Sequence, residues 1–481
     1  MKHETNQMRK KAYWASHAGQ TGRRPARPAA ESHPARVLRE DQCPLYRKCG
    51  GCQMQNLPYE DQLRWKQAQE VRLLGKFGRV APIMPMAHPL HYRNKVQAAF
   101  GTARNGRIIS GVYQSGTHRI VPVDHCLIED EQADRIIVTI RQLLRSFRIA
   151  PYDEDAETGL LRHVLVRRAF RTGEIMVVLV TARPAFPSRA NFVETLVQRH
   201  PEITTVVQNI NPGHTSMVLG EREEVLYGPG RIEDELCGCR FRISSRSFYQ
   251  VNPVQTEVLY QKAMEFAALT GSETVIDAYC GTGTIALIAA RQAKQVIGVE
   301  LNGDAVRDAI ANAKLNGQTH ARFYTGDAGE FMQRMAAAGE HADVVFMDPP
   351  RAGSDRRFLS SLLTLAPDRV VYISCNPETL ARDLWFLTQH GYRVRRIQPV
   401  DMFPHTHHVE TVCLLESTKN LPHTSFTVNM EDLPRPTRKS ASYDEIKAYI
   451  SEKHGLKASS RYIAQIKEKR GLKKVREFTY W

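Results

Sequence analysis

The chain has 481 residues, 42% of them hydrophobic, which is enough for about two to four domains with apolar cores. Its 66 Lys and Arg against 51 Asp and Glu give a formal net charge of +15, so a nucleic acid is the leading candidate partner. No run approaches 18 uninterrupted apolar residues and the first 20 residues lack a signal-peptide core, so we expect a cytoplasmic protein without a membrane span.

Residues 1–42 are rich in Lys, Arg, Pro and Gln and show no apolar period. This composition predicts a disordered basic arm, which either touches RNA or is a plain flexible tail.

A cysteine cluster follows the arm. It comprises Cys43, Cys49 and Cys52, with Gly50 and Gly51 inside it, and Cys126 is the natural fourth member. Nine cysteines in such a chain indicate ligands, a nucleophile and buried thiols rather than a disulfide framework. Four thiolates suit zinc and an iron–sulfur cluster equally well by count, so the spacing leaves the metal open.

The segment from Tyr59 to Phe77 has the apolar pattern of a helix, with Leu63, Val71, Leu73 and Leu74 as its apolar residues. From 92 to 250, β-like runs such as Lys95–Phe100 and Ile175–Thr181 alternate with Gly-rich and Asn-rich turns. We interpret residues 43–250 as a metal-bearing, RNA-binding region with a mostly β or α+β domain.

Short apolar strands alternate with helical stretches from residue 251 to about 418, which indicates parallel βαβ units in a doubly wound, Rossmann-like sheet. The predicted strands are Thr274–Ala278, Gln295–Glu300, Asp343–Asp348 and Val370–Ser374. Residues 419–481 open with a proline-containing linker and continue as basic helical patterns, Tyr443–His454 and Tyr462–Arg470. We find no internal repeat.

A cofactor site is indicated where the first of these strands ends. Gly281 and Gly283 let the backbone approach a ligand there, and Glu300, 23 residues after Asp277, suits a ribose diol. The third glycine of a dinucleotide fingerprint is missing, which favours a ligand with a ribose but no pyrophosphate, such as S-adenosylmethionine. Asp277 would then lie near its cationic methionine end, or else cap the following helix.

An acidic loop, Asp348-Pro-Pro-Arg351, follows the strand that ends near Met347. The prolines stiffen the loop and display Asp348 at the same sheet edge. Similar loops occur in enzymes that methylate nucleobase nitrogens, which gives one alternative function.

The next strand delivers Cys375, followed by Asn376 and Pro377, a pair suited to a helix cap and first turn. The positive end of that helix should favour the thiolate of Cys375. A thiolate that adds to uracil C6 makes C5 nucleophilic, and the C5 proton must then be removed. Glu410 is the candidate base, with its pKa raised by desolvation. The nearby His405, His407 and His408 lack partners for a metal site and are interpreted as RNA-facing or structural.

Six motifs together resemble the RNA 5-methyluridine methyltransferases, in that family's order and over about residues 43–416. They are the Cys43, Cys49, Cys52 and Cys126 set, Phe248-Tyr-Gln-Val-Asn252, Asp277-x-x-Cys-Gly-x-Gly-Thr284, Asp348-Pro-Pro-Arg351, Ser374-Cys-Asn-Pro377 and His408-Val-Glu410. The cysteines match the branch that methylates 23S ribosomal RNA, whereas the related transfer-RNA enzyme lacks them.

This resemblance implies a [4Fe-4S] cluster on the four cysteines. It implies S-adenosylmethionine contacts by Gln250, Tyr279, Glu300 and Asp348, with Cys375 as nucleophile and Glu410 as proton acceptor. It also implies that residues 55–86 pack on the catalytic domain, and we expect a monomer. Phe248 or Tyr249 would stack on a flipped base, unless both pack in the core.

The chain departs from the family pattern at both ends. The N-terminal oligonucleotide-binding barrel of several members is missing, and 419–481 extends past the usual end. The remaining alternatives are a transfer-RNA uracil-5-methyltransferase, an amino-group methyltransferase acting through Asp348, and a non-catalytic iron–sulfur protein that binds RNA.

Overall fold

The computed structural model describes residues 43–213, 217–418, 442–455, 460 and 463. The predicted arm 1–42 and, apart from Ile463, the predicted helix Tyr462–Arg470 lie outside the described residues. The chain divides into two compact units, Met1–Lys419 and Asn420–Trp481, which are described separately. Within the described residues, no helix is both long and apolar enough to cross a membrane.

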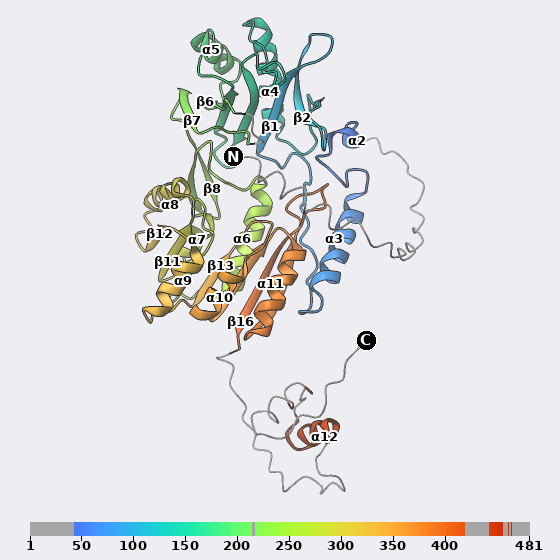
Figure 1. The fold of residues 1–481 in the computed structure, drawn as a ribbon, viewed down its shortest axis with the longest axis vertical. Helices are drawn as coiled ribbons and strands as arrows, with labels where there is room; N and C mark the ends of the chain where they lie inside the picture. The colour runs from blue at the N-terminus through green and yellow to red at the C-terminus, as the bar shows by residue number, and fades with distance from the viewer. Residues whose placement is uncertain (1–42, 214–216, 419–441, 456–459, 461–462, 464–481) are drawn as a thin grey trace, which may run out of the picture. The chain divides into compact units, whose positions relative to one another are not determined.

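The first unit contains an α+β domain built on a seven-stranded sheet in the order β3-β2-β1-β4-β5-β6-β7 (Figure 1). Helices α4 (Glu131–Ser146) and α5 (Arg189–Arg199) add to the strands that the sequence predicts and cover one face of the sheet. The strands are β1 Lys95–Thr102, β2 Ile108–Tyr113, β3 Ile120–Pro122, β4 Leu161–Arg168, β5 Ile175–Thr181, β6 Ile203–Ile210 and β7 Arg222–Tyr227. Strand β5 is buried throughout, because its other face packs into the catalytic core described next.

A hairpin of β8 (Ile232–Leu236) and β9 (Cys239–Ile243) follows. Both turn residues, Cys237 and Gly238, have positive φ, as a two-residue hairpin turn requires. The hairpin packs on α7 (Thr284–Ala290) and α8 (Gly303–Leu315) of the following domain, so the core of that domain begins before residue 251. It also contacts the preceding sheet, because Asp234 accepts hydrogen bonds from the Phe170 and Arg171 N–H groups.

The catalytic domain is built on a second seven-stranded sheet, in the order β12-β11-β10-β13-β14-β16-β15. Its strands are β10 Thr274–Asp277, β11 Gln295–Glu300, β12 Ala321–Thr325, β13 Val344–Met347, β14 Arg369–Ser374, β15 Tyr392–Val400 and β16 Glu410–Ser417. The four predicted strands, β10, β11, β13 and β14, are parallel, and so is β12, which the sequence does not predict, whereas β16 runs antiparallel to both of its neighbours. The strand order reverses between β10 and β13, which is where open α/β sheets bind ligands.

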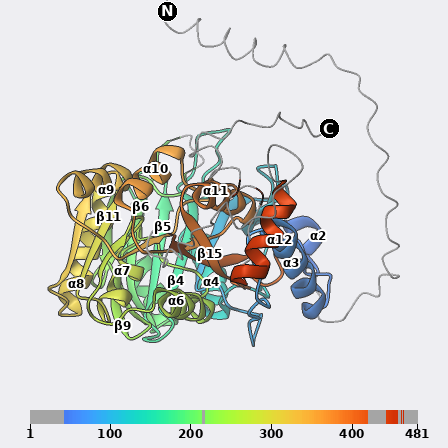
Figure 2. The same cartoon turned by 90° about the horizontal axis from the view of Figure 1, so that it is seen from below.

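Helices cover both faces of this sheet (Figure 2). One face carries α6 (Pro253–Ala267), α7 (Thr284–Ala290) and α8 (Gly303–Leu315). The opposite face carries α9 (Ala328–Ala337), α10 (Arg356–Leu365) and α11 (Pro377–Gln389). The strands between them are buried, so their side chains fill two apolar layers.

Helix α3 (Tyr59–Leu74) packs on α11 and β15 of the catalytic domain, although it precedes the first sheet in sequence. The segment after it pairs with the exposed edge of β15, through Val80 with Ile397 and Met84 with Val400. The helix ends three residues before the predicted Phe77. Its buried face also differs from the apolar pattern, because Val71 is 48% exposed whereas Gln62, Lys66 and Glu70 are buried.

These buried polar residues hold the loop between β15 and β16. Lys66 and Asp401 form an ion pair of 2.5 Å with both side chains fully buried, and Lys66 also donates to the Phe403 carbonyl. Gln62 bonds His405, and the Thr411 hydroxyl donates to Glu70. The pattern of apolar and polar residues does not predict that this face of α3 is buried, because the helix buries hydrogen-bonded polar groups there instead of apolar surface.

The second unit contains α12, Tyr443–His454, with the bounds that the sequence predicts. Ser442 and Glu445 form a reciprocal capping box at its start, and Gly455 ends it in the left-handed conformation.

Candidate active site

Four side chains meet at one edge of the catalytic sheet because of where their strands end or begin. Asp277 ends β10, Asp348 follows β13 directly, and Cys375 follows β14 directly. Glu410 begins β16, which is antiparallel and therefore starts at the same edge. This edge adjoins the reversal in strand order between β10 and β13.

The pairing of β14 with β16 sets the position of Cys375 relative to Glu410. The antiparallel ladder ends at the pair of Ser374 with Thr411, so Cys375 follows this pair on one strand and Glu410 precedes it on the other. Although they are 35 residues apart in sequence, the two side chains are close enough for the Glu410 carboxylate to help raise the pKa of the Cys375 thiol.

The expected electrostatic activation of Cys375 is wrong for the ligand-free protein. Helix α11 does begin at Pro377, with the Asn376 side chain as its cap, as predicted. However, burial and the carboxylates of Glu410 and Asp348 raise the pKa of the thiol to about 11, and Arg351 offsets this only in part. Burial, which disfavours the charged thiolate, together with two nearby carboxylates outweighs one helix terminus.

Glu410 has the environment expected of a proton acceptor. Its side chain is only 5% exposed, and burial raises the pKa of the carboxyl well above its usual value, with further contributions from Asp348 and Glu70. The Arg351 guanidinium opposes this rise. A carboxyl so placed takes up a proton at neutral pH more readily than an exposed one.

The glycine turn after β10 is open on its ligand side. Gly281 has φ of +52°, and a Cβ there would meet nothing within 4 Å. Gly283 has φ of +86° and packs tightly, since a Cβ would lie 3.1 Å from Ala309 and Phe323. The Gly281 N–H donates to the Glu300 carboxylate at 3.2 Å, so the turn and the end of β11 are joined.

Buried carboxylates next to this turn favour a cationic ligand. One oxygen of Asp277 accepts from the Ala286 N–H of α7, and the other is buried without a protein partner, so the residue caps the helix and also faces the site. Burial raises the pKa of Asp277 and of Asp348 to about 7. The charge of Asp348 contributes to the raised pKa of Asp277, and a bound positive charge would relieve this repulsion.

The other two predicted cofactor residues flank this site. Tyr279, two residues after the end of β10, shares a hydrogen bond with the Ser354 hydroxyl at 3.1 Å and packs on Phe358. Gln250 is half-buried and precedes α6, which starts at the Asn252 cap.

The resemblance predicts that residues 55–86 pack on the catalytic domain, but not that α3 lines a cavity there. A cavity of about 300 Å³ next to Cys375 is also lined by Trp65, Glu70 and Arg72 of α3, together with His407 and Arg351. The local sequence of α3 gives no sign of this contact, because the residues on the other side of the cavity lie more than 300 positions later in the chain.

The two aromatic candidates for base stacking differ. Phe248 is 70% exposed, and its carbonyl accepts from Thr282 beside the glycine turn. Tyr249 is 4% exposed and packs near Phe241, so it belongs to the core. Of the histidines, His405 is a structural residue bonded to Gln62, whereas His407 is exposed and lines the cavity.

Comparison with known proteins gives the family. The family model described as tRNA (uracil-5-)-methyltransferase matches residues 231–418, a stretch that begins just before the β8–β9 hairpin. An RNA methyltransferase of Halalkalibacterium halodurans is 47% identical over 391 residues, which are 80% of this chain and 85% of the relative. One from Listeria innocua is 46% identical over 380 residues, 78% of this chain and 83% of the relative. The chain belongs to the RNA 5-methyluridine methyltransferase family.

A solved member of similar fold is the Pyrococcus abyssi tRNA (uracil-54, C5)-methyltransferase in complex with S-adenosyl-L-homocysteine. Its TM-score is 0.64 and its identity 28%, over 76% of this chain and 85% of that one. This RNA methyltransferase therefore uses S-adenosylmethionine, and the acidic, glycine-lined edge of its sheet fits a ligand whose methionine end is cationic.

The cysteines of this methyltransferase gather at the junction of its two domains. Cys52 and Cys126 pack against one small cluster of Met86, Tyr92 and Ile128. Cys43 and Cys49 lie close enough to Cys52 for their charges to add to the effect of burial, which raises the pKa of the Cys52 thiol. Gly50, at φ of +75°, ends the short helix α2 (Tyr46–Cys49) and turns the chain between the second and third thiols.

The chemistry of these thiols suits a soft metal centre. Cysteine thiolates are ligands that both structural zinc sites and iron–sulfur clusters use. Four of them on neighbouring segments therefore fit either group.

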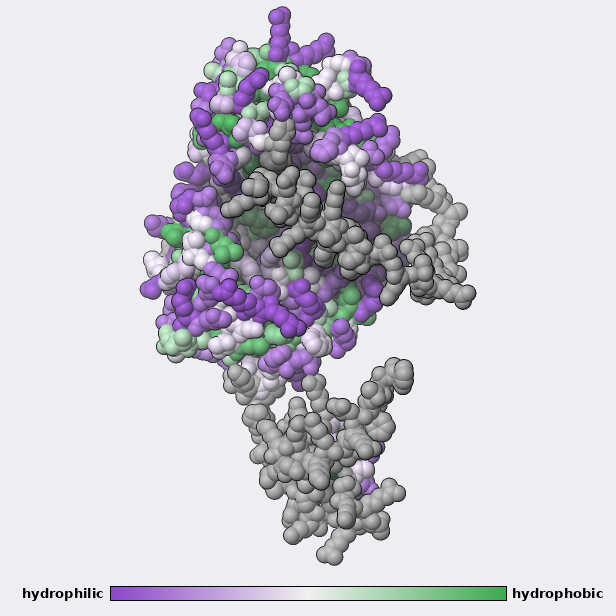
Figure 3. Space-filling view, viewed as in Figure 1, coloured by the Kyte–Doolittle hydropathy of each residue, from purple (hydrophilic) through white to green (hydrophobic). Residues whose placement is uncertain are grey.

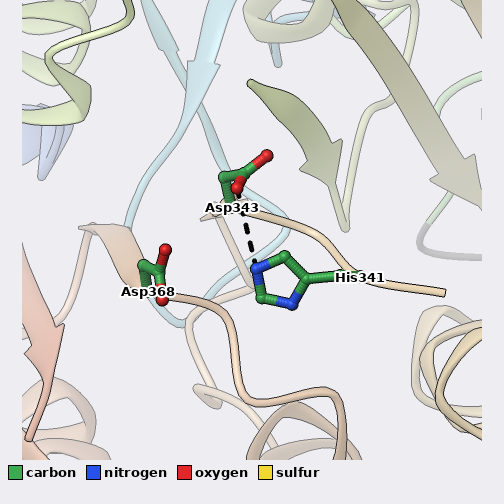
Figure 4. Close-up of side chains that lie close together, drawn as sticks. All are labelled: His341, Asp343 and Asp368. Atoms are coloured by element: carbon green, nitrogen blue, oxygen red, sulfur yellow. Dashed lines mark ion pairs between the residues drawn. The ribbon is translucent and has the colours of Figure 1, made fainter. Parts of the chain in front are cut away.

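Another group with metal-like spacing in this methyltransferase lies away from the site. His341, Asp343 and Asp368 approach within 4.8 Å of one another (Figure 4), but they precede β13 and β14 and so occupy the opposite edge of the sheet. Asp343 accepts from the Thr274 N–H at 2.7 Å, which fixes the start of β10. This group is a structural contact between strands.

Proposed function

We propose that this protein methylates C5 of a uridine in 23S ribosomal RNA through a covalent bond between Cys375 and C6 of the base. The observation that carries the proposal is the pairing of β14 with β16, which brings Cys375 and Glu410 to the edge of the sheet that also holds Asp348 and the glycine turn. An enzyme that methylates an exocyclic amine needs the acidic loop but needs neither a thiol nor a second, facing carboxyl.

Cys375 acts first in the proposed mechanism. Its thiol loses a proton and the sulfur bonds C6, while the π electrons of the C5–C6 bond move toward the C4 carbonyl. Since burial and the two carboxylates hold the thiol protonated in the free protein, the thiol gives its proton to solvent water as the RNA binds. S-adenosylmethionine supplies the electrophilic methyl group to C5 and leaves as S-adenosylhomocysteine.

Glu410 acts second. Its carboxylate takes the proton that remains on C5, the C5–C6 double bond re-forms, and the sulfur of Cys375 leaves C6. Burial and a raised pKa suit the carboxyl to this task. Gln250, Tyr279, Glu300 and Asp348 hold the cofactor, and Asp277 joins them because its unpartnered oxygen faces the same edge.

The four cysteines support the ribosomal substrate. Cys43, Cys49, Cys52 and Cys126 are proposed to hold a [4Fe-4S] cluster, which characterises the ribosomal-RNA branch that the chain resembles. The solved Pyrococcus abyssi relative acts on transfer RNA, so a transfer-RNA target is the competing assignment. Mapping 5-methyluridine in both RNA classes from a deletion strain distinguishes them, and a colourless, zinc-containing protein from anaerobic purification would contradict the cluster.

Covalent trapping tests the mechanism. Wild-type protein with S-adenosylmethionine and 5-fluorouridine-substituted RNA should give a denaturation-resistant complex, because fluorine on C5 cannot be removed as a proton. Cys375→Ala should abolish both the complex and methyl transfer. Glu410→Gln should accumulate the complex even with unsubstituted uridine, whereas Glu416→Gln, at the far end of β16, should behave as wild type.

The alternatives give opposite results. Full methylation by Cys375→Ala would indicate amine chemistry at the Asp348 loop. Failure of the wild type to bind S-adenosylmethionine would indicate a non-catalytic RNA-binding protein.

A further inference from the structure

Helix α3 exposes a tryptophan where it buries polar residues. Lys66 is fully buried in its ion pair with Asp401, while its neighbour Trp65 is 38% exposed. A large aromatic side chain left in contact with water has given up apolar burial, and near a functional cavity such exposure indicates a ligand.

Trp65 does not stand alone. Its ring stacks on the His407 ring with centroids 4.8 Å apart and 29° between the planes. Partial burial and the Lys66 ammonium lower the pKa of His407, so the imidazole is neutral at neutral pH and the pair presents uncharged aromatic surface. Both rings line the 300 Å³ cavity that Cys375 also lines, and the cations Arg72 and Arg351 stand at its rim.

We propose that the Trp65–His407 pair is a stacking surface for a nucleobase of the RNA substrate, next to the nucleophile. The inference rests on the proposed function. Every base offers a flat face that stacks on aromatic rings, and arginines at the rim suit the phosphates on either side of it. A base removed from its own stack to reach Cys375 loses neighbours, and this surface replaces one of them.

A purely structural role for Trp65 would be to hold the loop that carries His407. That loop already has several attachments that do not involve Trp65. Lys66 binds Asp401 and the Phe403 carbonyl, Gln62 binds His405, and the Met54 N–H donates to the His405 carbonyl at 2.9 Å. Removing the indole therefore leaves the loop anchored.

Binding of two labelled RNA probes to full-length protein tests the proposal. One probe is a fluorescein-labelled decauridylate and the other is a decamer of the same backbone with every base removed. Fluorescence anisotropy should show that Trp65→Ala weakens decauridylate binding about tenfold, within the range for one base stacked on an aromatic ring. The abasic decamer should bind this variant and the wild type equally, because it makes only backbone contacts.

Two further variants serve as controls. Trp65→Phe keeps an aromatic face and should retain most of the affinity for decauridylate. Trp385→Ala removes a tryptophan of α11 that is 54% exposed and does not line the cavity, and it should leave both probes unaffected. Thermal unfolding and S-adenosylmethionine binding of Trp65→Ala should match the wild type.

Two results would overturn the proposal. One is equal weakening of both probes by Trp65→Ala, which indicates a structural or backbone role. The other is wild-type affinity of Trp65→Ala for decauridylate, or no preference of the wild type for it over the abasic decamer. Covalent trapping with 5-fluorouridine RNA is read separately, so an absent adduct with intact base-dependent binding refutes the mechanism and not the stacking surface.

A further experiment decides whether the target base or a neighbouring base stacks on the pair. It uses a mapped RNA substrate with a single abasic residue at the target or at either adjacent position. The position whose loss removes the effect of Trp65→Ala is the base that stacks. Additive effects of Trp65→Ala and the abasic residue at all three positions would also overturn the proposal.

Discussion

The thiol of Cys375 is held protonated by its own active-site partners, which gives a direct test. Glu410→Gln removes the larger of two repulsive charges and should lower the thiol pKa from about 11. Iodoacetamide alkylation of the Cys375 peptide, followed by mass spectrometry at pH 8, should then be several-fold faster than in wild type. Glu416→Gln is the matched control, and an unchanged rate in Glu410→Gln would contradict the assigned cause.

Asp348 links the stability of the protein to pH. Its pKa rises from 3.8 unfolded to about 7 folded, so the folded state binds the extra proton between those values. Stability from this group is therefore present below about pH 4 and lost as the pH rises through 7. The asparagine of Asp348→Asn does not titrate. The free energy of unfolding of this variant, measured with urea, should therefore exceed that of the wild type by on the order of 2 kcal/mol at pH 8 and by less at pH 5. An equal difference at both pH values would contradict this.

At the glycine turn, alanine substitutions can distinguish the cost of a strained backbone from the loss of a ligand contact. Gly281 and Gly317 both have positive φ, and a Cβ at either would meet nothing within 4 Å. Alanine at either position should cost roughly 1–2 kcal/mol of stability for the left-handed conformation. Only Gly281→Ala should also lose S-adenosylmethionine binding in calorimetry, because only that Cβ occupies the ligand side. Equal binding by both variants would place the cofactor elsewhere.

The polar face of α3 should be as sensitive as an apolar core. Lys66→Met leaves Asp401 as a buried, uncompensated charge and should lower the free energy of unfolding by about 3–5 kcal/mol. Amide hydrogen exchange in the loop from Asp401 to Thr411 should rise in the same variant. Lys76→Met, at an exposed lysine just beyond the helix, should change neither quantity.

The sequence predicts elements wherever local chemistry decides the structure. Strand Ile175–Thr181 and helix Tyr443–His454 have the predicted bounds, because an apolar run and a capping box mark them. The sequence does not predict which side of α3 is buried, and it does not predict the raised pKa of Cys375. Both depend on partners brought together by the sheet, namely Asp401 for the helix and Glu410 for the thiol, and neither is close in sequence.

Along the whole sequence, positive charge is concentrated in the two terminal segments. Residues 1–42 hold nine Lys and Arg against four acids, and 419–481 hold fourteen against seven, so these segments carry most of the net charge of +15. The face of the first unit in Figure 3 is mostly hydrophilic, with small apolar areas between. RNA affinity should therefore depend on the extensions more than on the domains.

A variant that ends at residue 418 tests this distribution. Its RNA affinity should fall at moderate salt, and the slope of log affinity against log salt should be shallower by about 2 or more, one unit or slightly less for each lost phosphate contact. Covalent trapping of a short 5-fluorouridine RNA should persist. An unchanged slope would mean that the extension does not touch RNA.

The pairing of α3 with the loop after β15 sets when the enzyme becomes active during its own synthesis. Lys66 and Asp401 are 335 positions apart, and Gln62 and His405 are 343 apart. Translation makes α3 early, yet its polar face finds no partner until the last two strands of the sheet have left the ribosome. The nascent chain therefore has basic segments and half-built domains but no working site.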